Sequence, residues 1–223
     1  MRILIVSDIH GSADALRAVE EEIEAADLIL AAGDFTDFGG AEELAELIGL
    51  LGRGKAPIAA VPGNCDRAGA RRLLEAEGLS ADGRLLVAGG VLVAGAGGGS
   101  FRTGLTPYER TEEELDESIE AALNQAADHV AASPLVILTH TPPHGTDVDL
   151  RHGSHVGSRA LRTILDEVAP VLWVSGHIHE SRAVSREGAT LLVNPGPLHE
   201  GWYAVAELGG RPGSYAVEAE LRG

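Results

Sequence analysis

Seven side chains that can bind metal ions stand in five short polar clusters along this sequence. Each cluster directly follows a short apolar run, and the ligand residues are Asp8, His10, Asp34, Asn64, His140, His177 and His179. Carboxylate, imidazole and amide donors without thiolate suit Mn²⁺, Fe or Zn²⁺ better than Ca²⁺ or a structural zinc. Seven donors are too many for one tetrahedral ion, but they suit two ions that share a bridging carboxylate. The sequence therefore predicts a two-metal site.

The apolar runs before these clusters predict the strands that position them. They are short, continuous and apolar on both faces, which is typical of buried parallel strands. The runs are Ile3–Val6, Leu28–Ala31, Ile58–Val61, Leu135–Leu138 and Val171–Val174. Ligands of open α/β sheets bind at the carboxyl ends of the strands, so the five clusters are expected to converge on one site. Glycines 33, 63 and 176 are expected to let the backbone turn tightly there.

Helical patterns alternate with these strands, and this alternation predicts an α/β fold with right-handed crossovers. The patterns are Ser12–Glu24, Ala41–Leu51, Arg67–Glu77, Ser158–Val168 and a longer one from Pro107 to about Val130. Arg84–Ala96 predicts a hairpin that turns at Gly89-Gly90.

After Ile178 the pattern is mostly strand, which predicts a second, partly antiparallel sheet. The expected strands are Arg182–Ser185, Thr190–Val193, Trp202–Glu207 and Tyr215–Leu221. The predicted architecture is therefore a sandwich of two sheets flanked by helices. No linker or composition shift divides the chain, so residues 1–223 are expected to form a single domain.

The composition is strongly acidic. Seventeen basic residues face thirty-four acidic ones, a formal charge of −17, and only Lys55 is a lysine. Such a surface repels nucleic-acid phosphates, so no nucleic-acid partner is expected. The acidity suits a halophilic host, although a GC-rich genome also favours Arg over Lys. No apolar run spans a bilayer, no signal-peptide pattern opens the chain, and the single cysteine forms no internal disulfide. These features favour a cytoplasmic protein without a membrane partner, and they leave a homo-oligomer open.

The order of the clusters resembles a known family. D8-x-H10, G33-D34, G63-N64-C65-D66, H140 and G176-H177-x-H179 are similar to the motifs of the calcineurin-like metallophosphoesterases. Asn194-Pro195-Gly196 is typical of small members, and the Gly-rich loop 95–99, the loop around Gly153–Gly157 and the GHIHE ending resemble the Icc-related branch. The resemblance implies a four-layer α/β/β/α sandwich with two mixed β-sheets. It also implies two divalent metal ions, with Mn²⁺ first and Fe, Zn²⁺ or Ni²⁺ as alternatives.

Carried over to this sequence, the resemblance divides the ligands between two ions. One ion takes Asp8, His10, Asp34 and His179, and the other takes Asp34, Asn64, His140 and His177, with Asp34 as the bridge. The implied activity is hydrolysis of a small phosphate ester with a metal-bound hydroxide. A diester is the preferred substrate in this interpretation.

Cys65 departs from the family pattern, because many members have a histidine in its place. That histidine is thought to stabilise the transition state or to protonate the leaving group. A thiol has an unperturbed pKa near ~8.5 and is a poor hydrogen-bond donor, so Cys65 is not a comparable acid. We interpret Cys65 as a bystander beside the metals, with a metal contact or a nucleophile as the alternatives.

The loop of residues 140–157 offers substitutes for the missing histidine. Its candidate side chains are His144, Arg151, His152 and His155. His155 or His144 is expected to reach the substrate and to act as the catalytic acid. His129 and His199 are interpreted as incidental.

Two other classes of function are weighed against the phosphoesterase. A protein-binding scaffold of this fold exists in the retromer subunit, which has lost metal-ligand histidines, whereas this chain keeps all seven ligands. A nuclease like the large DNA-repair members is disfavoured, since neither a capping domain nor a basic surface is present in the sequence.

Overall fold

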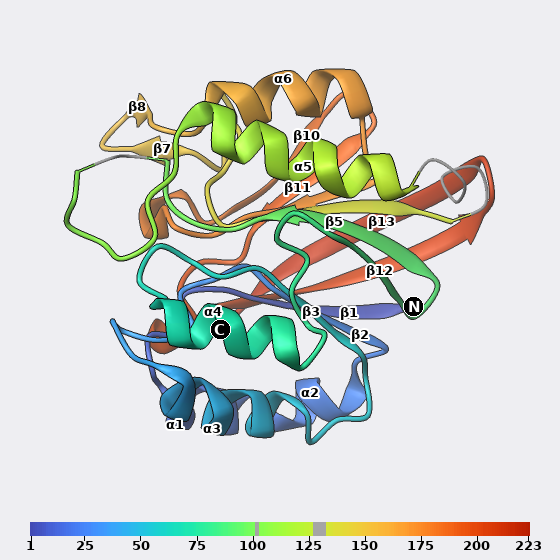
Figure 1. Cartoon of the computed structure of the whole chain (residues 1–223). Coiled ribbons are helices and arrows are strands. Elements are labelled where there is room, and N and C mark those ends of the chain that lie inside the picture. The colour runs from blue at the N-terminus through green and yellow to red at the C-terminus, as the bar shows by residue number, and fades with distance from the viewer. Residues whose placement is uncertain (101–102, 127–132) are drawn as a thin grey trace.

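Two mixed β-sheets lie face to face in the computed structural model, which describes residues 1–100, 103–126 and 133–223 (Figure 1). The first sheet has the order β13-β12-β1-β2-β3, with β1 (Arg2–Val6), β2 (Leu28–Ala31), β3 (Ile58–Ala60), β12 (Tyr203–Arg211) and β13 (Ser214–Arg222). The second has the order β10-β11-β9-β6-β5-β4, with β4 (Leu85–Ala88), β5 (Val91–Ala96), β6 (Leu135–Thr139), β9 (Leu172–Val174), β10 (Ala183–Glu187) and β11 (Thr190–Asn194).

Helices cover the outer face of each sheet (Figure 1). The first sheet carries α1 (Ala13–Ala18), α2 (Glu20–Ala25), α3 (Ala41–Leu51) and α4 (Ala68–Ala76), and the second carries α5 (Glu112–Ala126) and α6 (Arg159–Val168). Shorter elements are the hairpin of β7 (Leu150–Arg151) and β8 (Ser154–His155), and the 3₁₀ turns η1 (His179–Ser181) and η2 (Leu198–Glu200). The expected four-layer α/β/β/α sandwich is confirmed. Among the described residues, no helix has the length and apolar character that a bilayer span requires.

The alternation of β1 shows why the strands are apolar on both faces. Ile3 and Ile5 lie in the core between the two sheets, while Leu4 and Val6 pack against the helices below the first sheet. Successive side chains of a strand point to opposite faces, so a strand covered on both sides buries every residue.

The five predicted strands are divided between the two sheets. β1, β2 and β3 run parallel in the first sheet, and β6 and β9 run parallel in the second. Their carboxyl ends meet at one edge of the sandwich, where the His177 N–H donates to Asp8 Oδ2 over 3.1 Å. The convergence expected for a single open sheet is therefore achieved by two sheets together.

Two helix boundaries differ from the sequence prediction. The pattern of Ser12–Glu24 is interrupted at Val19, whose N–H donates to the Leu16 carbonyl and ends α1 in a tightened turn. The helix expected from Pro107 begins at Glu112. Thr111 and Glu114 exchange bonds there as a capping box, in which the Thr111 N–H donates to Glu114 Oε2 over 2.8 Å and the Glu114 N–H donates to Thr111 Oγ1 over 3.1 Å. The expected continuation to Val130 and His129 lies outside the described residues.

Candidate metal centre

Four of the predicted ligands stand in the left-handed region of backbone conformation. Their φ angles are 52° at Asp8, 45° at His10, 50° at Asp34 and 67° at His177. This region costs a non-glycine residue about 1–3 kcal/mol, and it persists only where the surroundings enforce it. Here the Asp8 N–H donates to Gly33 O and the His10 N–H donates to Asp34 O, both over 2.9 Å. The loops after β1 and β2 thus hold each other in a strained form that turns ligand residues toward one place.

Two of the neighbouring glycines are needed because side-chain oxygens of other residues lie close to their Cα atoms. A Cβ at Gly63 would overlap Asp34 Oδ1, and a Cβ at Gly176 would overlap Ser7 Oγ. Neither glycine has a positive φ, and of the three glycines only Gly33 adopts the left-handed conformation, with φ of 93°. The chain nevertheless turns at both, because the Asp66 N–H donates to Gly63 O over 3.4 Å and the Ile178 N–H donates to Gly176 O over 2.7 Å.

Asp8 presents one carboxylate oxygen without a hydrogen bond. Its Oδ2 accepts from Ser7 Oγ over 2.6 Å and from the His177 N–H, whereas the buried Oδ1 has no hydrogen-bond partner in the described part of the chain. Two rings face Oδ1 as ion-pair partners without hydrogen-bond geometry, with His179 Nε2 at 3.2 Å and His10 Nε2 at 3.9 Å. Burial raises the pKa of Asp8, but His179 outweighs this effect and holds the pKa below its usual value. A buried carboxylate oxygen that lacks a hydrogen bond and faces two imidazole nitrogens can bind a cation together with these rings.

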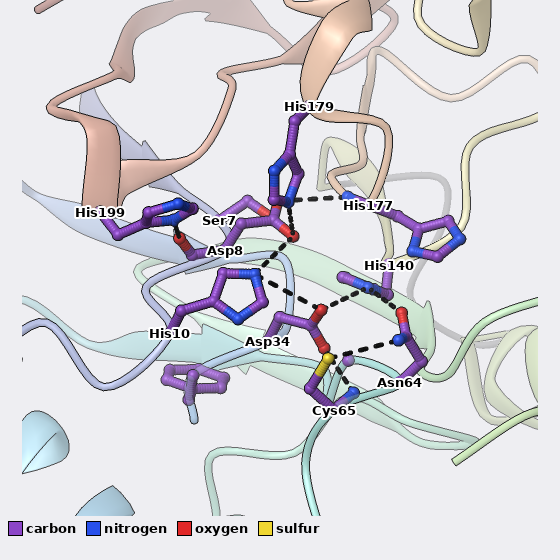
Figure 2. A network of polar contacts seen from close by, with 12 residues as sticks. Ser7, Asp8, His10, Asp34, Asn64, Cys65, His140, His177, His179 and His199 are labelled. Carbon is purple, nitrogen blue, oxygen red and sulfur yellow. Dashed lines mark hydrogen bonds and ion pairs between the residues drawn. The ribbon is translucent and has the colours of Figure 1, made fainter. Parts of the chain in front are cut away.

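Asp34 lies between the two halves of the site (Figure 2). Its Oδ2 is 3.5 Å from His140 Nε2 and 3.8 Å from His10 Nε2, while its Oδ1 accepts the Cys65 N–H over 2.7 Å. Burial raises the pKa of Asp34, but the charge of His140 outweighs this effect and keeps the pKa well below its usual range. The carboxylate is therefore ionised, and one of its oxygens faces a histidine on each side.

Asn64 and His140 contact each other through an amide oxygen and a ring nitrogen. His140 Nδ1 bonds Ala32 O over 2.7 Å, and its Nε2 lies 2.9 Å from Asn64 Oδ1. With Nδ1–H donated to the carbonyl, the Nε2 lone pair faces an amide oxygen, and a proton or a metal ion satisfies the pair. Burial lowers the pKa of His140, but Asp34 outweighs it and raises the pKa to about 9, so a metal ion that binds here displaces a proton.

His177 completes this half of the site. Its ring centroid is 4.9 Å from that of His140, and burial together with the charge of His140 lowers the pKa of His177 to about 4. The ring is therefore neutral and has a lone pair to offer. The loop that carries it is held by Asn194, whose Nδ2 donates to Ile178 O over 2.9 Å. The first residue of the Asn-Pro-Gly motif thus orients the last pair of ligands.

His199 belongs to the site, although the sequence interpretation set it aside. Its Nδ1 bonds the Asp8 carbonyl over 2.9 Å, and its ring centroid lies 4.9 Å from His10 and 5.6 Å from His179 (Figure 2). The backbone of η2 is docked on the β1 loop, with the Leu198 N–H donating to Ser7 O over 2.8 Å. The only sequence signal is the position of His199 shortly after the Asn-Pro-Gly motif.

The two residues after Asn64 have supporting positions. Asp66 accepts four hydrogen bonds, from the N–H groups of Phe35, Thr36 and Gly63 and from Thr36 Oγ1, and so joins the loops after β2 and β3. Burial and the charge of Asp34 raise the pKa of Asp66 to about 6. Cys65 is buried, and burial and Asp34 raise the pKa of its thiol, which opposes a thiolate nucleophile.

Cys65→Ser is expected to keep hydrolytic activity within about tenfold, a change of ~1.4 kcal/mol in the barrier. The backbone N–H of residue 65, which bonds Asp34, is unchanged by the substitution. Steady-state rates on a nitrophenyl diester measure the effect. A collapse over several orders of magnitude, or a phosphocysteine trapped by rapid quench, would show that the sulfur takes part in catalysis.

The loop after His140 is organised around one buried carboxylate. Asp149 accepts from the N–H groups of Gly145, Thr146 and Gly157 over 2.9–3.0 Å, and from His155 Nδ1 over 2.6 Å. Its side chain is 0% exposed, whereas that of His155 is 42% exposed. Hydrogen bonds to Asp149 thus fix the conformation of the loop, and one of them holds the His155 ring at Nδ1.

The other two histidines of this loop differ in their surroundings. The His144 ring lies 5.8 Å from the His155 ring, while His152 is 80% exposed and pairs with Glu180. The catalytic assignment of His155 or His144 stays a prediction.

Asp149→Asn is expected to destabilise the protein at pH 7 by roughly 1–3 kcal/mol, because an amide N–H₂ would face backbone donors. Burial raises the pKa of Asp149, but His155 and the backbone donors outweigh it and lower the pKa. A carboxylate with a lowered native pKa stabilises the fold above its unfolded pKa near ~4 and loses this contribution as the pH falls through the native pKa. Thermal melts of metal-free protein from pH 8 to pH 3 should therefore show a wild-type advantage that shrinks below about pH 4.

The matched control is Asp166→Asn, at a carboxylate that is 57% exposed. It should shift the melting temperature little. A gap between wild type and Asp149→Asn that is equally large at pH 7 and pH 3 would contradict the electrostatic part of this prediction.

Donor atoms gather in overlapping groups at this edge of the sandwich. The ligand atoms lie within 4.8 Å of one another in Asp8, His10 and His179, and likewise in Asp8, Asp34 and His140. Adding Asn64 and His177 to the second group brings together all seven predicted ligands. The donor chemistry, the strained loops and the unbonded Asp8 oxygen fit divalent cations.

Comparison with known proteins gives concordant matches. The family model of calcineurin-like phosphoesterases matches residues 1–181. The uncharacterized protein MJ1162 of Methanocaldococcus jannaschii is 32% identical over 206 residues, which is 88% of each chain. The solved structure of TT1561 from Thermus thermophilus superposes with a TM-score of 0.72 at 22% identity over 92% of each chain. A dimetal phosphatase from Danio rerio superposes with a TM-score of 0.67 at 12% identity over 98% of each chain.

The four-layer sandwich and the carboxylates and histidines at its edge define a metal-dependent phosphoesterase. The chain belongs to the calcineurin-like phosphoesterase family, whose members bind divalent metal ions.

Proposed function

We propose that this protein is a di-metal phosphodiesterase for small phosphate esters, with Mn²⁺ as the preferred metal. The supporting observation is a set of carboxylate, imidazole and amide groups that converge at one edge of the sandwich. Asp8 Oδ1 has no hydrogen-bond partner among the described residues, and Asn64 Oδ1 lies 2.9 Å from His140 Nε2. The free energy spent on burying such groups is recovered when cations bind.

Each ion has its own set of protein ligands in this proposal, and Asp34 serves both. One set is Asp8, His10, Asp34 and His179, and the other is Asp34, Asn64, His140 and His177. Two divalent ions, when bound, supply Lewis acidity that activates water and neutralises charge on the phosphoryl oxygens. The protein holds the ligands in place through the strained loops and through the bonds to Ser7, Ala32 and Asn194. The relative from Danio rerio is described as a dimetal phosphatase, which supports two ions over one.

The proposed preference for diesters is based on Cys65, which stands where many family members have a histidine. A neutral thiol with a raised pKa is a weak donor and gives little help to a leaving oxygen, so good leaving groups are favoured. The formal charge of −17 opposes long nucleic acids and leaves small esters as substrates.

The test is hydrolysis of bis(4-nitrophenyl) phosphate and of 4-nitrophenyl phosphate by chelator-stripped protein after addition of Mn²⁺, Fe²⁺, Zn²⁺ or Ni²⁺. Saturable, metal-dependent turnover is expected, with Mn²⁺ best and with the diester favoured in kcat/KM by about tenfold or more. The leaving group is identical in the two substrates, so the ratio reports the ester type.

Turnover that persists in the stripped, folded protein would refute metal dependence. A preference for the monoester would overturn the diesterase proposal while leaving a phosphoesterase. Circular dichroism of the stripped protein serves as the control that the fold survives removal of the metal.

A further inference from the structure

A cavity of 260 Å³ lies beside the candidate metal centre. It is lined by Arg151, His177, Ile178, His179 and Glu180. Two of these residues are proposed metal ligands, and Arg151 supplies a guanidinium from a different part of the chain. The cavity therefore connects the proposed site of phosphate hydrolysis with the permanent positive charge of Arg151.

The backbone of Arg151 is fixed relative to His179. The β7–β8 hairpin pairs Arg151 with Ser154, and the Leu150 N–H donates to Ser181 Oγ over 2.8 Å. Ser181 Oγ in turn donates to Asp147 O over 2.8 Å. Because Ser181 belongs to the same 3₁₀ turn as His179, the hairpin and the metal ligand form one connected unit.

Within the described part of the protein, the guanidinium has only a long ion pair with Glu180. The Arg151 side chain is 61% exposed, and its Nε lies 4.0 Å from Glu180 Oε1, which is too long for a hydrogen bond. The other oxygen of Glu180 is taken by His152, through the N–H and Nδ1 at 3.2 Å each. By contrast, the guanidinium of Arg182 donates to two backbone carbonyls. Arg151 thus keeps its donors available beside the cavity.

We propose that Arg151 binds a second phosphate group of the substrate, next to the one that is hydrolysed. This inference rests on the proposed function and narrows its substrate class to small esters that carry two phosphates. A guanidinium fork matches phosphate oxygens in a bidentate way. In a chain of formal charge −17, a second anionic group needs such a local cation to enter the site. The volume lies below the ~300–1,000 Å³ of pockets that enclose a drug-sized ligand, so the remainder of the substrate extends into solvent.

The test uses two nucleotides that differ by one phosphate. Thymidine 3′,5′-bisphosphate and thymidine 5′-phosphate are compared as competitive inhibitors of bis(4-nitrophenyl) phosphate hydrolysis by the metal-loaded full chain. Wild type is expected to bind the bisphosphate about tenfold more tightly or better, and Arg151→Gln should reduce this ratio to about twofold. Arg151→Lys should retain part of the ratio, because it keeps the charge and loses the fork.

Arg159→Gln is the matched control, because Arg159 is exposed nearby at the start of α6 and does not line the cavity. It should keep the wild-type ratio. An unchanged ratio in Arg151→Gln, with a wild-type melting temperature, would overturn the inference even if the ester is hydrolysed. If no ester is hydrolysed with any metal, the proposed function fails. Calorimetric binding of the same two nucleotides then decides the role of Arg151 separately.

Discussion

Asp34→Ala is expected to lose both metal ions and to lower kcat/KM on a nitrophenyl diester by at least about a thousandfold, or ~4 kcal/mol. Asp34 Oδ2 is the oxygen that faces His140 Nε2 at 3.5 Å and His10 Nε2 at 3.8 Å, so it serves both halves of the site. Without this carboxylate, each ion keeps only three of its proposed protein ligands and loses the negative charge that the two sets share. Elemental analysis after dialysis measures the metal content, and steady-state kinetics measures the rate.

The design separates loss of metal from loss of fold. Asp34 Oδ1 accepts the Cys65 N–H, so Asp34→Asn is the second variant, because its amide oxygen keeps an acceptor for that N–H. It should also lose most of the metal and activity while melting close to the wild-type temperature. Asp14→Ala, at a carboxylate that is 95% exposed, is the neutral control. Two ions retained in Asp34→Ala, together with activity, would refute the bridging assignment.

His140→Ala is the companion variant that tests how the ligands are divided. It removes the ring that faces Asn64 Oδ1 at 2.9 Å but leaves the group of Asp8, His10 and His179 intact. One ion per chain is therefore expected to remain after dialysis, in contrast to Asp34→Ala. Equal loss of both ions in the two variants would mean that the division of ligands is wrong.

His155→Ala is expected to spare an activated nitrophenyl diester and to slow an alkyl diester by roughly a hundredfold to ten-thousandfold, the range of general acid catalysis. The Asp149 carboxylate holds His155 Nδ1 at 2.6 Å, which leaves Nε2 as the nitrogen that can give a proton outward. A poor leaving group needs that proton, whereas nitrophenolate leaves without it. The ratio of kcat values for the two substrates is the measurement.

The neighbouring histidines provide the comparison. His144→Ala tests the alternative donor, whose ring lies 5.8 Å from that of His155, and His152→Ala alters a ring that pairs with Glu180. Only one of the three variants should change the leaving-group dependence. Equal effects on both substrates would assign the residue to binding, and no effect from any variant would leave water as the proton source.

Much of the site was predictable because its signals are local. A strand buried on both faces is an apolar run, and the polar residues that follow it, such as Asp8 after Val6 or His140 after Thr139, mark the end that faces a ligand. Donor types and numbers then indicate two divalent ions without knowledge of any distance. The capping box of Thr111 and Glu114 is local in the same way, although the sequence prediction placed the start of this helix at Pro107.

Packing alone decided the rest. The five strands had to be divided between two sheets before Asp8 and His177, 169 residues apart, were joined by a hydrogen bond. His199 contacts the Asp8 carbonyl across 191 positions, and nothing in its neighbours along the chain reveals this contact. The Arg151 cavity likewise exists because a hairpin docks on the turn that carries His179. Periodicity and turn formation depend on residues close together in the sequence. These contacts depend instead on how whole layers bury their apolar faces against one another.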